Sequence, residues 1–201
     1  PEIYEMQVQA IVEAACEVTQ ERGVDVQARI MIPLISHAAE LERLRAICAE
    51  ERSKRFADYP EVQLEVPIGT MIELPRACLS ADEVAVHADF FSFGTNDLTQ
   101  TTFGVSRDDC GNFLPLYVEA GILPIDPFVS IDPAVGTLVE MATTKGRSVK
   151  PTLSVGICGE HGGEPKSVAF CHSIALDYVS CSPFRIPVAR LAAAHAALEQ
   201  R

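Results

Sequence analysis

Tryptophan is missing from the sequence, and aromatic residues of all kinds make up only 6% of its 201 residues. Basic residues are also scarce, since 16 Lys and Arg face 28 Asp and Glu and leave a net charge of −12. Such an excess of negative charge repels nucleic acids and anionic lipid surfaces. No apolar run is long enough to cross a bilayer. We therefore expect neither a nucleic acid nor a membrane as a partner.

Paired cysteine spacings are absent as well. Seven cysteines are scattered along the chain, and none belongs to a CxxC pair. Structural zinc sites usually need such pairs, so zinc is not expected. Scattered, unpaired thiols are typical of a reducing compartment, which predicts a cytoplasmic protein. A plastid or another organelle stays open, because a transit peptide would precede Pro1.

What the sequence does contain is a regular alternation of strand-like and helix-like segments. Short continuous apolar runs predict strands buried on both faces, and apolar residues three and four apart predict the helices between them. In the last helix we expect one face to be buried, formed by Val188, Leu191, His195 and Leu198. His195 would then be a core histidine. Five strands are predicted, at residues 28–35, 65–74, 89–94, 153–158 and 176–181.

Strands that alternate with helices indicate a parallel α/β sheet, either doubly wound or closed into a barrel. A nucleotide-binding sheet usually carries a GxGxxG or P-loop turn after its first strand, and neither motif is present. Polar clusters instead follow several different strands, as in barrels. We therefore predict a partial (β/α)8 TIM barrel, with residues 1–201 forming one domain of about five C-terminal β/α units. About three strands would be missing from its N-terminal side.

A long connection, residues 104–130, separates the third and fourth predicted strands. It is rich in Gly, Pro and Asp, and one short helix is predicted near 112–120. Connections of this length are uncommon unless they act as lids or binding loops. We expect this segment to cover or line a site.

Three of the predicted strands end in residues suited to chemistry. Glu73 ends the second strand, residues 94–97 (Gly-Thr-Asn-Asp) follow the third, and Cys158 ends the fourth. In a barrel the carboxyl ends of all strands open onto one mouth. Glu73 and Asp97 would repel each other there unless a cation joined them, and Mg²⁺ typically takes one or two protein carboxylates. The thiol of Cys158 could then deliver a proton to a carbon atom near that ion.

Structural roles are the alternatives for these residues. Glu73 could pair with Arg76, and Asp97 could simply cap the following helix. Most cysteines in such a protein are inert packing residues. His161 could tune the Cys158 thiol or be a hydrogen-bonded loop residue, and we favour the loop role. For Arg107, a phosphate contact and a surface pair with the neighbouring Asp108 or Asp109 are both open.

With these residues in view, the chain resembles the phosphoenolpyruvate-utilising enzymes. The stretch DFFSFGTNDLTQTTFGVSR (89–107) is similar to their signature, and GTMIELPRA (69–77) is similar to their metal-binding strand. GICGEHGGEP (156–165) and LDYVSCSPFRIPVARLAAA (176–194) resemble one branch most. That branch catalyses ATP + phosphate + pyruvate ⇌ AMP + diphosphate + phosphoenolpyruvate. The resemblance covers nearly the whole chain.

The resemblance implies a role for each candidate residue. Glu73 and Asp97 match Mg²⁺ ligands that also contact the substrate, phosphoenolpyruvate or pyruvate. Gly94, Thr95 and Asn96 match the substrate-binding turn. Cys158 matches the proton donor to an enolate stabilised by Mg²⁺.

The resemblance also implies partners outside this chain. A phosphohistidine domain and an ATP-grasp domain of the same full-length chain would deliver the phosphoryl group, and a homodimer is expected. Alone, the 201 residues would have little or no activity. Phosphoenolpyruvate synthase and enzyme I of the sugar phosphotransferase system are the nearest alternatives. A lyase or aldolase barrel and a non-catalytic pyruvate-binding barrel fragment are more distant ones.

Overall fold

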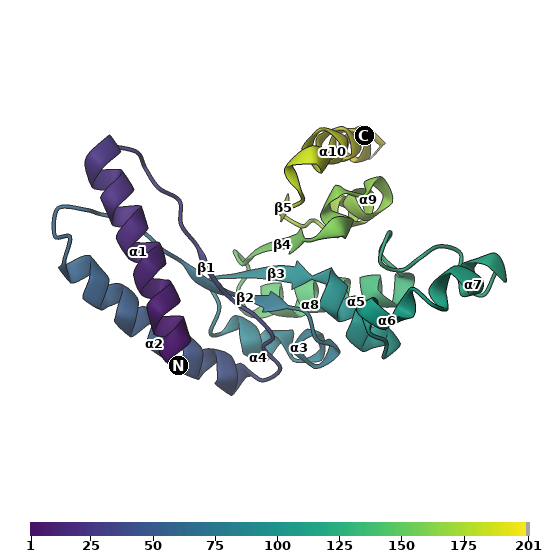
Figure 1. Cartoon of the computed structure of the whole chain (residues 1–201), viewed down its shortest axis with the longest axis horizontal. Helices are drawn as coiled ribbons and strands as arrows, with labels where there is room; N and C mark the ends of the chain where they lie inside the picture. The colour runs from purple at the N-terminus through teal and green to yellow at the C-terminus, as the bar shows by residue number, and fades with distance from the viewer. Residues whose placement is uncertain (200–201) are drawn as a thin grey trace.

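The computed structural model describes residues 1–199, and in this part of the chain five strands form one sheet (Figure 1). All neighbouring strands are parallel. The five predicted strands are confirmed, although each is shorter than the apolar run that predicted it. In sheet order they are β1 (Ile30–Ile32), β2 (Ile68–Ile72), β3 (Phe90–Gly94), β4 (Ser154–Cys158) and β5 (Tyr178–Val179).

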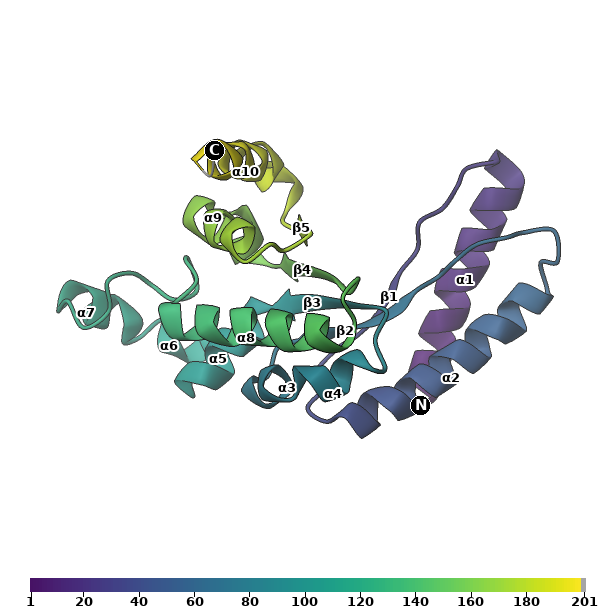
Figure 2. The same ribbon diagram turned by 180° about the vertical axis from the view of Figure 1, so that it is seen from behind.

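Helices occupy every connection between the strands. The α8 helix runs along the back of the sheet, with α3 and α4 beside it (Figure 2). The short helix predicted within the 104–130 connection is confirmed as α7. None of the helices among residues 1–199 is long and apolar enough to cross a membrane. The helices are α1 (Glu2–Arg22), α2 (Ala38–Ala57), α3 (Pro75–Leu79), α4 (Ala81–Ala85), α5 (Thr95–Phe103), α6 (Arg107–Cys110), α7 (Leu114–Glu119), α8 (Pro133–Val149), α9 (Pro165–Ser173) and α10 (Ile186–Glu199), with 3₁₀ turns η1 (Glu160–Gly163) and η2 (Pro183–Arg185).

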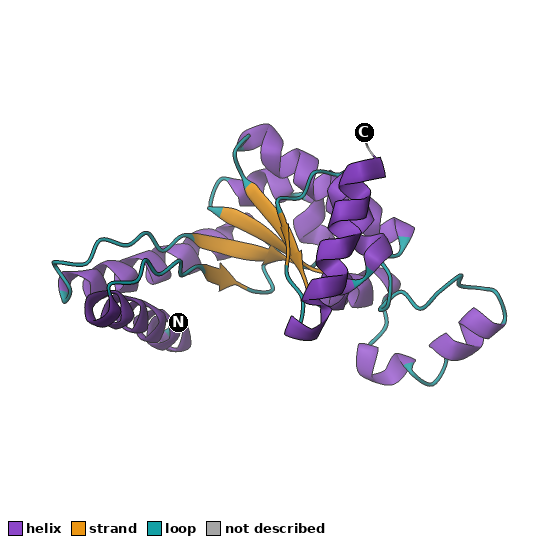
Figure 3. Cartoon of the chain, turned by 90° about the horizontal axis from the view of Figure 1, so that it is seen from above, coloured by secondary structure: helices purple, strands orange, loops and turns teal. Residues whose placement is uncertain are grey.

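The order of the strands identifies the fold as part of a β/α barrel. Each new strand pairs with the previous one on the same side, in the order β1-β2-β3-β4-β5. Because crossovers between parallel strands are right-handed, an order without reversal places all connecting helices on one face. A doubly wound sheet would instead reverse direction and cover both faces. Figure 3 shows the twisted strands from above, with the helices around them.

The two faces of the sheet have different surroundings. In β1, Ile30 and Ile32 are buried towards the helices, whereas Met31 between them is 39% exposed on the opposite, interior face. Side chains of a strand alternate between faces, so the register extends this division across the sheet. Met71 pairs with Ser92, and Gly94 with Cys158, on the interior face.

The prediction of which face of the last helix, α10, is buried is wrong. His195 is exposed, and Leu191 and Leu198 are 57% and 61% exposed. Alanines on the other side of α10, including Ala189 and Ala192, are buried next to α9 instead. Small side chains let the two helix backbones approach closely, and they carried too little hydrophobicity to predict the contact.

Candidate active site

Glu73, Gly94 and Cys158 come together at the carboxyl end of the interior face. Gly94 pairs with Cys158 in the register of β3 and β4, and Glu73 follows Met71 by two residues on the same face. A Cβ atom added to Gly94 would overlap the Glu73 carboxylate. Gly94 has an ordinary negative φ of −87°, so glycine is required here for space rather than for backbone freedom. The absent side chain is what admits the carboxylate.

Glu73 is a buried acid with a backbone donor beside it. Only 2% of the residue's surface is exposed. Its Oε1 accepts a hydrogen bond of 2.7 Å from the N–H of Leu34. Leu34 follows β1 and has a φ of +53°, a left-handed conformation that is rare for leucine. Sequence reasoning missed this donor, because nothing in the residue types around Leu34 marks its conformation.

Asp97 lies next to Glu73. Burial raises the pKa of Glu73, the hydrogen bond from Leu34 opposes this rise, and the negative charge of the nearby Asp97 carboxylate adds to it. The α5 helix begins at Thr95, so Asp97 lies in its first turn and the capping alternative is wrong. The alternative pairing of Glu73 with Arg76 is not observed either, and Arg76 donates to the carbonyl oxygen of Ser36.

The two acids fit a magnesium ion better than a softer metal. Among residues 1–199 there is no cluster of three or more His, Cys, Asp or Glu side chains that could hold a metal. Zinc usually needs three or four protein ligands, whereas Mg²⁺ binds through one or two carboxylates and completes its shell with water and substrate oxygens. Two adjacent carboxylates, one of them with a raised pKa, are a donor set that a hard divalent cation would stabilise.

Cys158 differs from the packing cysteines of the chain. Its thiol is half-buried on the interior face and donates a weak hydrogen bond of 3.5 Å to the carbonyl oxygen of Phe93. Burial raises its pKa, so the sulfur is protonated at neutral pH. Cys78 and Cys171 are fully buried, and burial raises the pKa of each to about 12. Among these three thiols, only that of Cys158 faces the acids.

The residues after β3 contact the loop after β4. Thr95 is buried, and its Oγ1 lies 2.7 Å from Nδ1 of His161, which confirms His161 as a hydrogen-bonded loop residue. Asn96 donates through Nδ2 to Oε2 of Glu160 over 2.7 Å. Arg107 pairs with Glu160 at 2.8 Å rather than with its acidic neighbours. The predicted substrate turn is therefore held by the strand end that carries Cys158.

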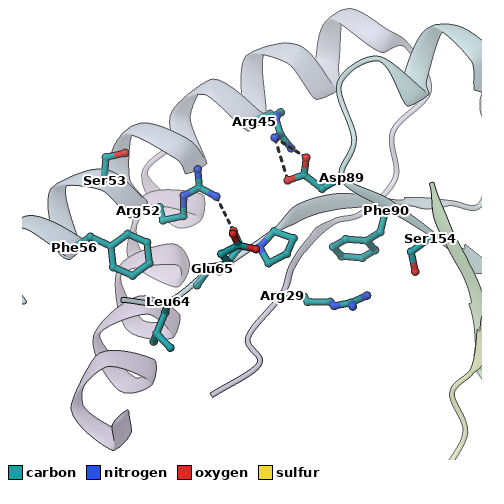
Figure 4. A pocket seen from close by; sticks show the side chains of 12 residues that line it. Arg29, Arg45, Arg52, Ser53, Phe56, Leu64, Glu65, Asp89, Phe90 and Ser154 are labelled. Carbon is teal, nitrogen blue, oxygen red and sulfur yellow. Dashed lines mark hydrogen bonds and ion pairs between the residues drawn. The ribbon is translucent and has the colours of Figure 1, made fainter. Parts of the chain in front are cut away.

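A cavity of about 570 Å³ lies at the other end of the strands (Figure 4). None of the predicted site residues lines it. Arg45 donates to both carboxylate oxygens of Asp89, at 2.8 and 3.0 Å, and Arg52 donates to the carbonyl oxygen of Val66 at 2.6 Å. These arginines tie α2 to the starts of β2 and β3, so we interpret this region as a stabilising part of the fold.

Comparisons with known proteins identify relatives along the whole chain. A family model described as PEP-utilising enzyme, PEP-binding domain, matches residues 1–198. The pyruvate, phosphate dikinase of Clostridium symbiosum is 54% identical over 202 aligned residues, which cover 100% of this chain and 23% of that protein. The chloroplastic pyruvate, phosphate dikinase of Flaveria trinervia is 57% identical over 195 residues, or 96% of this chain and 20% of that protein. The chain thus spans about a fifth of the length of these curated relatives.

A solved structure shares the fold with little sequence identity. The citrate lyase of Burkholderia xenovorans LB400 superimposes with a TM-score of 0.61 at 14% identity. The match covers 94% of this chain and 53% of that chain. At this identity the likeness concerns the fold alone.

Proposed function

The chain belongs to the phosphoenolpyruvate-utilising enzymes, whose phosphoenolpyruvate-binding domain it matches over residues 1–198, and on that premise we propose that it carries the pyruvate site of a pyruvate, phosphate dikinase. The reaction would be ATP + phosphate + pyruvate ⇌ AMP + diphosphate + phosphoenolpyruvate. Two curated relatives with that name, 54% and 57% identical, support this choice within the family. The observation that carries the proposal is that two acids and one protonated thiol lie near one another at the carboxyl ends of three neighbouring strands, β2, β3 and β4.

Glu73 and Asp97 would hold the divalent ion, Mg²⁺, through their carboxylate oxygens. When bound, such an ion supplies a fixed positive charge beside an enolate oxygen. The Leu34 N–H restrains the Glu73 carboxylate through its hydrogen bond to Oε1. The turn at residues 94–97 lies at the start of α5, where backbone N–H groups have no partner within the helix and suit an anionic substrate.

Cys158 would carry the proton. When the phosphoryl group leaves phosphoenolpyruvate, the remaining enolate accepts the Sγ proton at its methylene carbon and becomes pyruvate, leaving a thiolate. In the other direction the thiolate removes a proton from the methyl group of pyruvate. A raised pKa keeps the thiol protonated until the carbon is ready to accept, as an acid of this kind requires. A phosphohistidine domain of the full-length protein would take up the phosphoryl group, and an ATP-grasp domain would exchange it with ATP.

Cys158→Ala in the full-length protein tests the proton role. We expect overall pyruvate formation to fall by at least about 100-fold, the range typical of lost general acid catalysis. Phosphoryl exchange between phosphoenolpyruvate and the protein should persist in part, because that step does not need the thiol. Cys171→Ala, at a buried cysteine away from the acids, is the matched control. Unchanged turnover by Cys158→Ala would contradict the assignment.

Product analysis of the wild-type full-length protein separates the sister activities. During phosphoenolpyruvate synthesis from pyruvate, a dikinase is expected to release diphosphate and AMP. Release of free phosphate during phosphoenolpyruvate synthesis would indicate a phosphoenolpyruvate synthase. Transfer to a phosphocarrier protein would indicate enzyme I.

A further inference from the structure

Glu160 and His161, two successive residues of the loop after β4, contact the same two segments of the chain. One segment is the turn that begins α5, and the other is the 104–130 connection. Glu160 accepts from Asn96 of the turn at 2.7 Å and from Arg107 of the connection at 2.8 Å. These two donors lower the pKa of Glu160 to about 2, Arg107 contributing more than Asn96. The carboxylate therefore acts only as an acceptor and holds the Nδ2 end of the Asn96 amide.

His161 makes the equivalent pair of contacts with its two ring nitrogens. Nδ1 lies 2.7 Å from Oγ1 of Thr95 in the turn, and Nε2 lies 3.0 Å from the carbonyl oxygen of Pro127 in the connection. The side chain is completely buried. Three segments that are distant in the sequence thus meet at one imidazole ring.

The partners of His161 determine where its proton lies. The carbonyl oxygen of Pro127 can only accept, so Nε2 must carry the hydrogen. Burial lowers the pKa of His161, and the neutral ring has no hydrogen on Nδ1. The hydroxyl of Thr95 consequently donates to Nδ1. The other acceptor near this hydroxyl is the carbonyl oxygen of Cys158, at the longer distance of 3.5 Å. Both acceptors belong to the protein, so what Thr95 can donate to a substrate is its backbone N–H.

We call Glu160 and His161, with their contacts to the turn and to the 104–130 connection, the clamp. The loop that carries the clamp follows directly on Cys158, which carries the thiol. Gly159, between Cys158 and Glu160, has a φ of +90°, a conformation that other residues rarely adopt. At the other end of the loop, a Cβ atom on Gly162 would overlap the carbonyl oxygen of Ser180. The loop is therefore fixed on both sides of Glu160 and His161. We therefore expect a change in the clamp to act on the turn rather than to be absorbed by movement of the loop.

We propose that Glu160 and His161 are positioning residues, which hold the backbone of Thr95 and the amide of Asn96 in register with the thiol of Cys158. This inference rests on the proposed function, because it concerns the alignment of the same substrate. It also gives the 104–130 connection a role, since Arg107 and Pro127 close the clamp from outside. A shift of about 1 Å in such an alignment can cost on the order of 100-fold in rate.

Two substitutions of His161 separate its two contacts. His161→Asn keeps an acceptor near Nδ1 for the Thr95 hydroxyl and loses the contact with Pro127. His161→Gln keeps a donor near Nε2 for Pro127 and loses the acceptor for Thr95. In the full-length protein we expect His161→Gln to lower kcat for pyruvate formation by about 10- to 100-fold with a smaller change in KM. His161→Asn should retain more of the activity.

A double-mutant cycle with Thr95→Val tests the coupling. If the Thr95 hydroxyl acts through His161, the double variant Thr95→Val/His161→Gln should be no slower than His161→Gln alone. His195→Gln, at an exposed histidine of α10, is the control and should turn over like the wild type. The apparent Tm of each variant shows whether a loss of folding explains a loss of rate.

The outcomes distinguish this inference from the proposed function. Losses that multiply in the double variant, or a His161→Gln protein as active as His195→Gln, would overturn the positioning role while leaving the proposed function in place. A wild-type protein that converts neither pyruvate nor phosphoenolpyruvate would overturn the proposed function, and the positioning role with it.

Discussion

At Gly94 the backbone of β3 passes so close to Glu73 that a side chain cannot be accommodated. The position of the acid therefore depends on a residue that makes no chemical contact with a substrate through its side chain. From the sequence, Gly94 was assigned to the candidate substrate-binding turn. The structure shows in addition that it admits the carboxylate, which only the pairing of β2 with β3 could reveal.

We predict that Gly94→Ala displaces the Glu73 carboxylate and weakens divalent-ion binding. Turnover of pyruvate by the full-length protein should fall by about 100-fold, as expected for a misplaced group in an active site. Titration with Mn²⁺, followed by its paramagnetic signal, would report the loss of affinity directly. Gly111→Ala is the control, because a Cβ atom added there meets nothing within 4 Å. Tight Mn²⁺ binding by Gly94→Ala would refute the spatial argument.

Two aspartates that precede strands make the same set of contacts. Asp89 precedes β3, and its Oδ2 accepts from the N–H of Ile68 at 2.8 Å while Arg45 of α2 binds the carboxylate. Asp177 precedes β5, and its Oδ2 accepts from the N–H of Val155 at 2.7 Å while Arg147 of α8 binds it at 2.9 Å. Each aspartate thus joins the start of the neighbouring strand to an outer helix.

We expect Asp89→Ala to lower the free energy of unfolding by about 1.5–3 kcal/mol, the range for hydrogen bonds to charged groups. The substitution leaves the N–H of Ile68 without its acceptor and Arg45 without its counter-charge. Urea denaturation of the isolated chain measures the change. Asp82→Ala is the control, because Asp82 makes a partly exposed ion pair of 2.9 Å with Lys145, and ion pairs near the surface are typically worth less than about 1 kcal/mol. Equal effects of the two substitutions would argue against a special role for Asp89.

Elements with a strong local signal were predictable, and contacts between distant elements were not. The strands were found because continuous apolar runs are typical of buried parallel strands. The buried face of α10 was misjudged because its contact with α9 uses alanines such as Ala192. The acids and the thiol were predicted as site residues from their places at strand ends, and their roles stay predictions. The pairing of Arg107 with Glu160 joins residues 53 positions apart, and no local pattern announces it.

Across the whole molecule, the interior face and the first strand leave apolar surface exposed. β1 lies at one edge of the sheet, and α1 and β1 line a cavity of about 650 Å³ together with side chains such as Ile3 and Met31. Ile3 is 62% exposed and Met31 is 39% exposed. Unpaired strand edges and apolar patches promote association between chains.

The isolated 201-residue chain should therefore associate with further copies of itself as its concentration rises. Sedimentation velocity would show the increase in mass, and Met31→Lys combined with Ile3→Lys should reduce it. Leu116→Lys changes an equally hydrophobic side chain on α7 that is 60% exposed, so it serves as the control. A strictly monomeric wild-type chain at high concentration would contradict the prediction.

One end of the strands stabilises the fold and the other carries the candidate active site, and this separation affects which substitutions the protein can accept. Asp89 and Asp177 fasten the starts of the strands, whereas Glu73 and Cys158 stand where the strands finish. Substitutions that raise heat resistance can accumulate around the first set without touching the second. Variants selected in the laboratory for activity at higher temperature should therefore carry substitutions around Asp89 and Asp177 and keep the original turnover rate.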